Sequence, residues 1–108
     1  IGDAQVTTLG AHIMARAYGA KMITPQTRPV WGIEEVEGGF TGAGFVEFEY
    51  SDIAPEPVES IPPDPETDPH ECPRRDAAGR QQLATFLKTG IIEQYCEGRC
   101  VAVREGCR

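Results

Sequence analysis

The residues with the clearest chemistry are four cysteines, and all of them lie in the last 37 residues: Cys72, Cys96, Cys100 and Cys107. An even number of cysteines beside glycine and charged residues is typical of two disulfide bonds. A Cys96–Cys100 bond would close a very small ring, so we rank that pairing lowest. The favoured arrangement joins Cys72 to one tail cysteine and pairs the other two. Such a cross-link would stabilise the chain by about 2–4 kcal/mol.

Zinc is the alternative for the same side chains. His70, Cys72, Cys96 and Cys100 supply four ligands of the type that zinc prefers, and Cys107 supplies a fifth. The Cys-x3-Cys spacing falls within the range of structural zinc sites, although the usual signature has two tighter Cys-x2-Cys pairs. A third interpretation is unpaired thiols in a reducing compartment. No cofactor is expected apart from this zinc alternative.

Catalytic residues cannot be assigned from the sequence. The only histidines are His12 and His70. His12 is interpreted as a surface residue without a role, and His70 as a loop residue whose alternatives are a ligand or a Cys–His pair with Cys72. There is no phosphate-binding loop, dinucleotide fingerprint or HExxH motif, and no pair of carboxylates stands out for acid–base catalysis.

The first of three regions, residues 1–50, has the patterns of folded α/β structure. Leu9, Ile13 and Ala17 form one row at helical spacing, which predicts a helix over residues 11–18 that ends at Gly19. Short strands are predicted on either side of it, over residues 5–9 and 21–23.

Two further strands are predicted over residues 30–36 and 44–50, joined through glycines as a β-hairpin. In the second of these strands Val46, Phe48 and Tyr50 should point to the core, and Glu47 and Glu49 to solvent.

The second and third regions differ sharply in composition. Residues 51–73 hold seven of the nine prolines, interleaved with acidic residues, which predicts an extended connector without helix or central strand. In residues 74–108, Asp76 should cap a helix that carries an apolar stripe and ends at Gly90, followed by the cysteine-containing tail. The stripe consists of Leu83, Phe86 and Leu87. We expect one small domain over residues 1–108.

Charge limits the partners. The net charge is −7, and 13 of the 17 acidic residues fall between Glu34 and Asp76. This excess argues against nucleic acid, since phosphate binding needs clustered basic residues. No apolar run approaches the ~18 residues that span a membrane, so no membrane insertion is expected. The start at Ile1 predicts a processed N-terminus or a fragment, and favours a secreted or organellar location over a cytoplasmic one.

One segment resembles known families. Residues 6–21, VTTLGAHIMARAYGAK, resemble the nucleophile-elbow strand and helix of class I glutamine amidotransferases, and Trp31-Gly32 continues the similarity. His70-Glu71 resembles that family's final His-Glu pair. Thr8, however, stands where the family has its catalytic cysteine. Residues 3–14 equally resemble a strand–helix unit of the ribose-5-phosphate isomerase B family. These resemblances imply a strand, a glycine turn and a helix, and no functional residue is carried over from them.

The sequence therefore predicts an α/β or α+β fold with a small mixed sheet, two helices, an extended proline-rich connector and a cysteine-containing tail. The predicted function is that of a small acidic accessory or binding subunit, without a complete active site, that acts through contacts between its glycine-rich hairpin or connector and a partner protein. One alternative is a processed subunit or fragment of a larger α/β enzyme, hydrolase or amidotransferase-like, with Thr8, His12 or His70 in a shared site. The other alternative is a small zinc-binding module.

Overall fold

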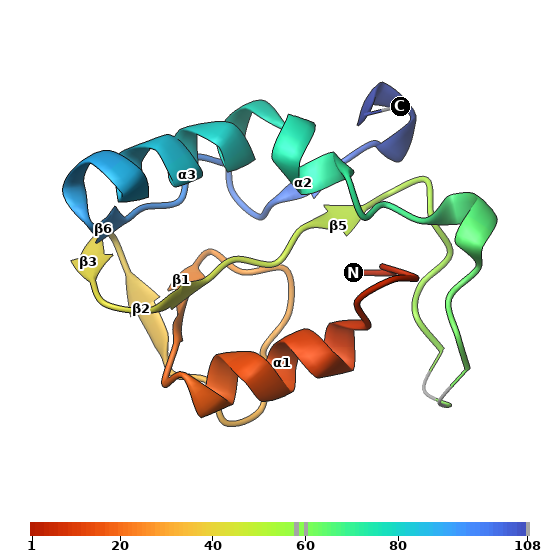
Figure 1. Cartoon of the computed structure of the whole chain (residues 1–108), viewed down its shortest axis with the longest axis horizontal. Coiled ribbons are helices and arrows are strands. Elements are labelled where there is room, and N and C mark those ends of the chain that lie inside the picture. The colour runs from red at the N-terminus through yellow and green to blue at the C-terminus, as the bar shows by residue number, and fades with distance from the viewer. Residues whose placement is uncertain (58, 60, 108) are drawn as a thin grey trace.

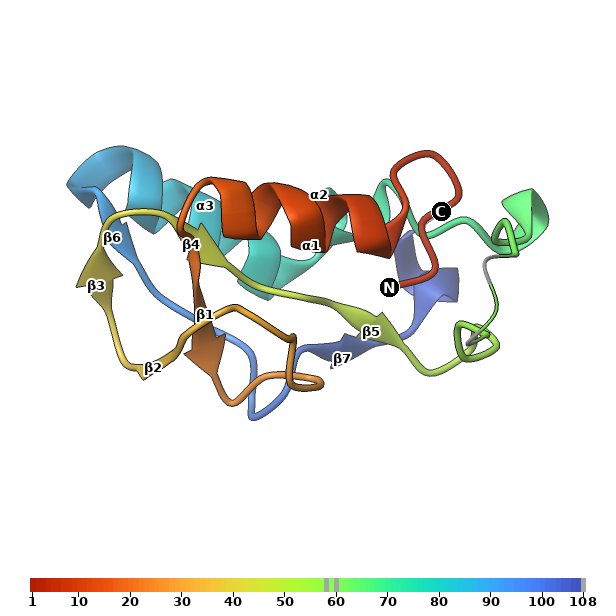
Figure 2. The ribbon, with the colours of Figure 1, turned by 90° about the horizontal axis from the view of Figure 1, so that it is seen from below.

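The helices and most of the strands form two layers in the computed structural model, which describes residues 1–57, 59 and 61–107. Figure 2 shows the two long helices on one side of the strands, and Figure 1 views these layers face-on, with α1 and α3 apart from each other. The helices are α1 (Thr8–Ala17), α2 (Cys72–Arg75) and α3 (Ala77–Thr89), with 3-10 turns at Pro65–Thr67 and Arg104–Cys107. The strands are β1 (Lys21–Thr24), β2 (Glu35–Glu37), β3 (Phe40–Thr41), β4 (Gly44–Phe45), β5 (Glu49–Tyr50), β6 (Ile91–Ile92) and β7 (Val101–Ala102). The predicted mixed α/β class is confirmed.

The strands pair mostly in parallel. Strand β1 lies between β2 and β4, with Met22 opposite both Glu35 and Phe45. Strands β3 and β6 pair antiparallel, and β5 pairs with β7 in parallel. The predicted hairpin between residues 30–36 and 44–50 is therefore wrong. The reason is that β1, with Met22 and Ile23 both buried, takes the central position that suits the most apolar strand.

The predicted strand over residues 44–50 is broken into two short strands that join different sheets. Strand β4 pairs with β1, and β5 pairs with β7. Phe48 and Tyr50 are buried as expected. Glu47, which was expected to face solvent, is only 7% exposed. The alternation fails at this residue because the strand is interrupted and the carboxylate turns inward to polar partners.

Helix α1 begins earlier than predicted and replaces the strand expected over residues 5–9. The Thr7 hydroxyl accepts a hydrogen bond from the Gly10 amide at 3.2 Å and caps the helix. One Asp3 carboxylate oxygen accepts from the amides of Gln5 and Val6, each at 2.8 Å. Local bonds from side chains to the backbone of this kind compete with strand formation. The predicted end of the helix is confirmed, since Gly19 follows it with φ of 62°.

Helix α3 has the predicted ends but not the predicted burial. The Asp76 carboxylate accepts from the Ala78 and Gly79 amides at 2.8 and 3.1 Å, and Gly90 ends the helix in the left-handed region. A Cβ atom at Gly79 would lie 2.2 Å from the Pro73 carbonyl oxygen, so only glycine allows this close approach to α2. The stripe expected to face the core remains exposed, and it comprises Leu83, Phe86 and Leu87.

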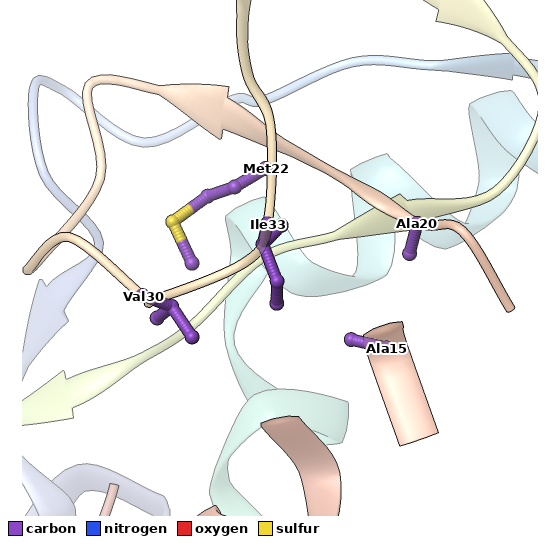
Figure 3. Packing of buried hydrophobic residues seen from close by; sticks show 5 residues of the cluster. All are labelled: Ala15, Ala20, Met22, Val30 and Ile33. Atoms are coloured by element: carbon purple, nitrogen blue, oxygen red, sulfur yellow. The ribbon is translucent and has the colours of Figure 1, made fainter. Parts of the chain in front are cut away.

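Two groups of buried side chains form the core. The first joins α1 to β1 and the loop after it, and Figure 3 shows the side chains of its members: Ala15, Ala20, Met22, Val30 and Ile33. The second joins β5 to α2 and the tail, and consists of Phe48, Tyr50, Cys72 and Cys100.

The proline-rich connector lies along the body of the protein. Its Glu56 accepts a hydrogen bond from the Gly2 amide at 2.9 Å. Its Asp68 accepts from the Ala4 amide at 3.1 Å and from the Gln5 side chain at 3.0 Å. Within the described part of residues 51–71, the only regular element is the short 3-10 turn, as the proline content predicts. At residues 72–73 the prediction is wrong, since α2 begins at Cys72, and Pro73 fits the first turn of a helix, where no amide donor is needed. The N-terminal segment and the connector thus hold each other in place.

Candidate functional site

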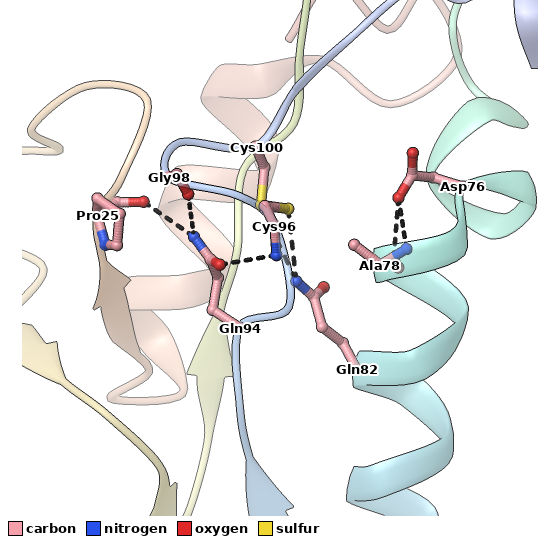
Figure 4. The surroundings of a disulfide bond; sticks show 9 residues. Pro25, Asp76, Ala78, Gln82, Gln94, Cys96, Gly98 and Cys100 are labelled. Atoms are coloured by element: carbon pink, nitrogen blue, oxygen red, sulfur yellow. Dashed lines mark hydrogen bonds between the residues drawn. A yellow bond between two sulfur atoms is a disulfide. The ribbon is translucent and has the colours of Figure 1, made fainter.

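The tail cysteines form the bond that was ranked lowest. Cys96 and Cys100 are joined by a disulfide, with Cα atoms 5.2 Å apart, so the predicted ranking of the pairings is wrong. Gly98, at φ of 82°, makes the turn between them. The Gln94 side chain accepts from the Cys96 amide and donates to the Gly98 carbonyl, both at 2.8 Å, as Figure 4 shows. These bonds hold the loop between Cys96 and Cys100 in a conformation that brings the two sulfur atoms together.

The loop is also held against the rest of the protein. Gln94 donates to the Pro25 carbonyl at 3.1 Å, and the Gln82 amide of α3 contacts both disulfide sulfurs at 3.9 Å. Cys72 is buried and is itself disulfide-bonded. Cys107 was also predicted as a disulfide or metal-binding residue, but its side chain is not among those that the structure describes.

Loss of the Cys96–Cys100 bond gives a first prediction. Replacing both cysteines with alanine should lower the free energy of unfolding by about 2 kcal/mol, because a ring this small removes only modest entropy from the unfolded chain. Urea denaturation of the double variant and the unaltered protein, both without reductant, measures the difference. An unchanged free energy of unfolding would show that the bond does not contribute to stability.

The side chains proposed for zinc are engaged in other bonds, although Cys72, Cys96 and Cys100 pack in or against the second core cluster. Both ring nitrogens of His70 have polar partners. Its Nδ1 lies 2.8 Å from an Asp3 carboxylate oxygen, and its Nε2 lies 3.3 Å from an Arg74 nitrogen. Cys96 and Cys100 are bonded to each other. Within residues 1–57, 59 and 61–107, no group of three His, Cys, Asp or Glu side chains is placed to hold a metal ion.

A buried charged cluster lies instead beneath α1. The Glu47 carboxylate accepts from Arg28 twice, at 3.1 and 3.2 Å, and from the Thr27 hydroxyl at 3.0 Å. His12 Nε2 lies 2.9 Å from the same carboxylate. The prediction that His12 is a surface residue without a role is wrong, since its side chain is 15% exposed and helps to enclose this group. Arg28 also donates to Glu56 at 3.0 Å.

The hydrogen bonds within the cluster favour the charged forms of Glu47, Glu56 and Arg28. Burial by itself raises the pKa of Glu47, but the hydrogen bonds from Arg28 and His12 hold that pKa below its usual value. Burial likewise opposes the charge of Arg28, whose pKa is nevertheless raised by its bonds to Glu47 and Glu56. The Thr8 hydroxyl donates to Glu56, and the pKa of Glu56 is lowered by this bond and others in spite of burial. Carboxylates with lowered pKa values are poor general bases at neutral pH.

An apolar groove runs between α1 and α3, with the segment around β4 as its floor. Its volume is 750 Å³. A second hollow of 470 Å³ continues it toward the start of α3 and shares seven lining residues with it: Val6, Ala11, Phe45, Val46, Gly79, Gln82 and Leu83. The glycine-rich segment predicted to form a hairpin loop thus contributes, through Gly42 and Gly44, to the groove.

The groove is bordered by large apolar side chains that the rest of the chain leaves uncovered. Met14 is 51% exposed and Tyr18 70% exposed on α1, and Leu83 is 58% exposed on α3. Exposed apolar surface that is contiguous marks interaction sites. The sequence does show these rows at helical spacing, but the pattern alone does not tell a row that faces the core from one that faces an unoccupied groove.

Comparisons with known proteins found no similar protein. The chain matches no protein-family profile, no curated protein and no solved structure. In the part of the chain that the structure describes, no helix is long and apolar enough to span a membrane. The function is therefore inferred from the geometry of the groove and the charged cluster.

Proposed function

We propose that this protein is a small binding subunit, without a complete active site of its own, whose groove between α1 and α3 holds an apolar segment of a partner protein. The observation that carries the proposal is the row of exposed side chains facing one another across the groove, with Met14 and Tyr18 on one side and Leu83 on the other. Each Å² of apolar surface that the partner segment covers contributes about 25 cal/mol to the free energy of binding.

A helix is the segment that suits this groove. Helices α1 and α3 lie in one layer above the strands, with the groove between them (Figure 2). Stable domains complete such layers by packing helix beside helix over a common floor. Recognition of an amphipathic helix by an apolar groove uses anchors spaced three or four residues apart.

The charged cluster supports a binding role rather than a catalytic one. Glu47 is enclosed by His12, Thr27 and Arg28, and the Thr8 hydroxyl donates to Glu56. These bonds tie α1 to the loop after β1 and to the connector. The cluster thereby fixes α1 as one wall of the groove.

The test uses a synthetic helical peptide with leucine and alanine on one face and glutamine on the other. Titrated into the ¹⁵N-labelled protein, it should produce saturable shifts of the amides that line the groove. Leu83→Asp should weaken binding at least about tenfold, since burying one leucine is worth roughly 1.5–3 kcal/mol. Leu87→Asp is the matched control, because Leu87 is 73% exposed on the same helix and outside the groove.

Two results would contradict the proposal. One is the absence of saturable binding by the unaltered protein. The other is an equal loss of affinity in the Leu83→Asp and Leu87→Asp variants, which would place the contact away from the groove.

A further inference from the structure

The three α-helices carry only basic charged side chains, whereas the rest of the chain is acidic overall. Together α1, α2 and α3 carry five of the ten Lys and Arg residues and none of the 17 Asp and Glu residues. All of the acidic residues therefore lie in strands, loops and the connector. A protein with a net charge of −7 thus has helices whose charged side chains are all basic.

Two of these basic residues border the groove. Arg74 and Arg80 line the hollow at the start of α3. Arg80 is exposed and forms no ion pair within the described residues, and Arg74 contacts Glu71 at 2.7 Å on the exposed surface. This end of the groove can therefore attract an anionic group.

Glu71 offsets the charge of Arg74, which leaves Arg80 as the cation without an ion pair among the described residues at this end. The other acidic residues at the groove do not offset the charge of Arg80. Asp3 is bound to His70, and Glu47 is enclosed in the charged cluster with Arg28. Glu93 lines the groove at the other end, near Ile92. The groove is therefore basic at the end that is next to α2 and acidic at the end that is next to β6.

From this charge distribution we infer that the partner segment is an acidic amphipathic helix, with its apolar face in the groove and its carboxylates over Arg74 and Arg80. The inference rests on the proposed binding function and adds the chemistry of the partner. A symmetric dimer through this groove is disfavoured, because the second copy would bring the same basic helices against the first. Nucleic acid is disfavoured by the apolar floor of the groove, because phosphate binding needs clustered basic residues rather than apolar surface.

The test compares three synthetic helical peptides that share one apolar face and differ only in the polar face, which is built from Glu, Gln or Lys. At low salt the Glu peptide should bind about fivefold more tightly than the Gln peptide, and the Lys peptide more weakly than both, because exposed ion pairs are individually modest. At 1 M NaCl the three affinities should converge, since the Debye length falls to about 3 Å.

Variants on α3 locate the effect. Arg80→Glu should reverse the order of the Glu and Lys peptides. Lys88→Glu makes the same change of charge on the same helix but outside the groove, and it should keep the order. Circular dichroism verifies that both variants are folded.

The outcomes separate this inference from the proposed function. Equal binding of the three peptides, lost in Leu83→Asp, would overturn the acidic partner and keep the groove as a binding site. Failure of all three peptides to bind would overturn both. Concentration-dependent self-association that Leu83→Asp abolishes, measured by sedimentation velocity, would assign the groove to a second copy. Leu83-dependent binding to phosphatidylglycerol vesicles, without binding to the Glu peptide, would assign the groove to an anionic membrane surface. Self-association through the groove and binding to these vesicles would each overturn the inference.

Discussion

Replacing Met22 with alanine is expected to lower the free energy of unfolding by about 3 kcal/mol, the range found when a large side chain is removed from a packed core. Met22 is 1% exposed, lies on the central strand β1 and packs in the first core cluster (Figure 3). The chain contains one other methionine, Met14, which is 51% exposed on α1. Met14→Ala is the matched control and should change the free energy of unfolding by about 0.5 kcal/mol or less.

Urea denaturation followed by circular dichroism measures both variants. The contrast between the two methionines tests the burial of β1, since the same chemical change is made at a buried position of β1 and at an exposed position of α1. Equal losses of stability in the two variants would contradict this packing.

Replacing Arg28 with methionine should destabilise the protein by about 3 kcal/mol at pH 7. The substitution keeps an unbranched apolar stem but removes the guanidinium, and so leaves the Glu47 carboxylate, 7% exposed, without the cation of Arg28. An unpaired buried charge costs several kcal/mol. Lys21→Met is the matched control, since it removes a cation that pairs with the exposed Glu34 at 2.9 Å, and such pairs contribute about 0–1 kcal/mol.

The effect of Arg28→Met should depend on pH in a defined direction. In the unaltered protein the pKa of Glu47 is lowered, despite burial, by Arg28, His12 and Thr27. Its contribution to stability is therefore present above the pKa of the unfolded chain, about 4.3 for glutamate, and is lost as the pH falls through the folded value. In the variant, burial without the cation should raise the same pKa, so that acidification relieves the penalty.

The difference in stability between the two proteins should thus shrink as the pH is lowered from 7 toward 4. Denaturation curves at several pH values check this trend. A difference that stays constant over this interval would show that Glu47 is not the group affected. Arg28→Met also removes the bond from Arg28 to Glu56 at 3.0 Å, but Glu56 has further bonds from Thr8 and the Gly2 amide that do not involve Arg28, so the larger effect is expected at Glu47.

The sequence predicts α3 and the end of α1 because these helix ends depend on neighbouring residues, but it did not predict α2 or the start of α1. Asp76 and Gly90 mark the ends of α3, and Gly19 follows the end of α1, each through local capping geometry. The strand predicted over residues 21–23 is confirmed as β1, Lys21–Thr24. These features need no knowledge of the distant parts of the chain.

Strand pairing was predicted poorly because it depends on contacts that are distant in sequence. The hairpin was inferred from two neighbouring strands, whereas β1 separates β2 from β4, and β5 pairs with a strand near residue 101. The disulfide was ranked by ring size alone. The bonds that Gln94 makes to both arms of the loop and to Pro25 lie outside what the cysteine spacing reveals.

The candidate site was predicted only in its general character. A protein-binding role was inferred from the lack of a catalytic pattern, but the surface was assigned to the hairpin or the connector. The apolar rows of α1 and α3 are visible in the sequence, but their periodicity does not reveal whether a second layer covers them. The Glu47 cluster was missed because strand alternation placed that residue in solvent.

The parallel pairing of β5 with β7 has a consequence for how the chain folds. Glu49 pairs with Val101 and Tyr50 with Ala102, so the chain must close a loop of about fifty residues before this pair can form. The second core cluster, which includes Tyr50 and Cys100, is completed only when that closure has taken place. Contacts of such high sequence separation are typical of slow folding. During synthesis, the strand at residues 49–50 must therefore wait, unpaired, until the segment around residue 101 has left the ribosome.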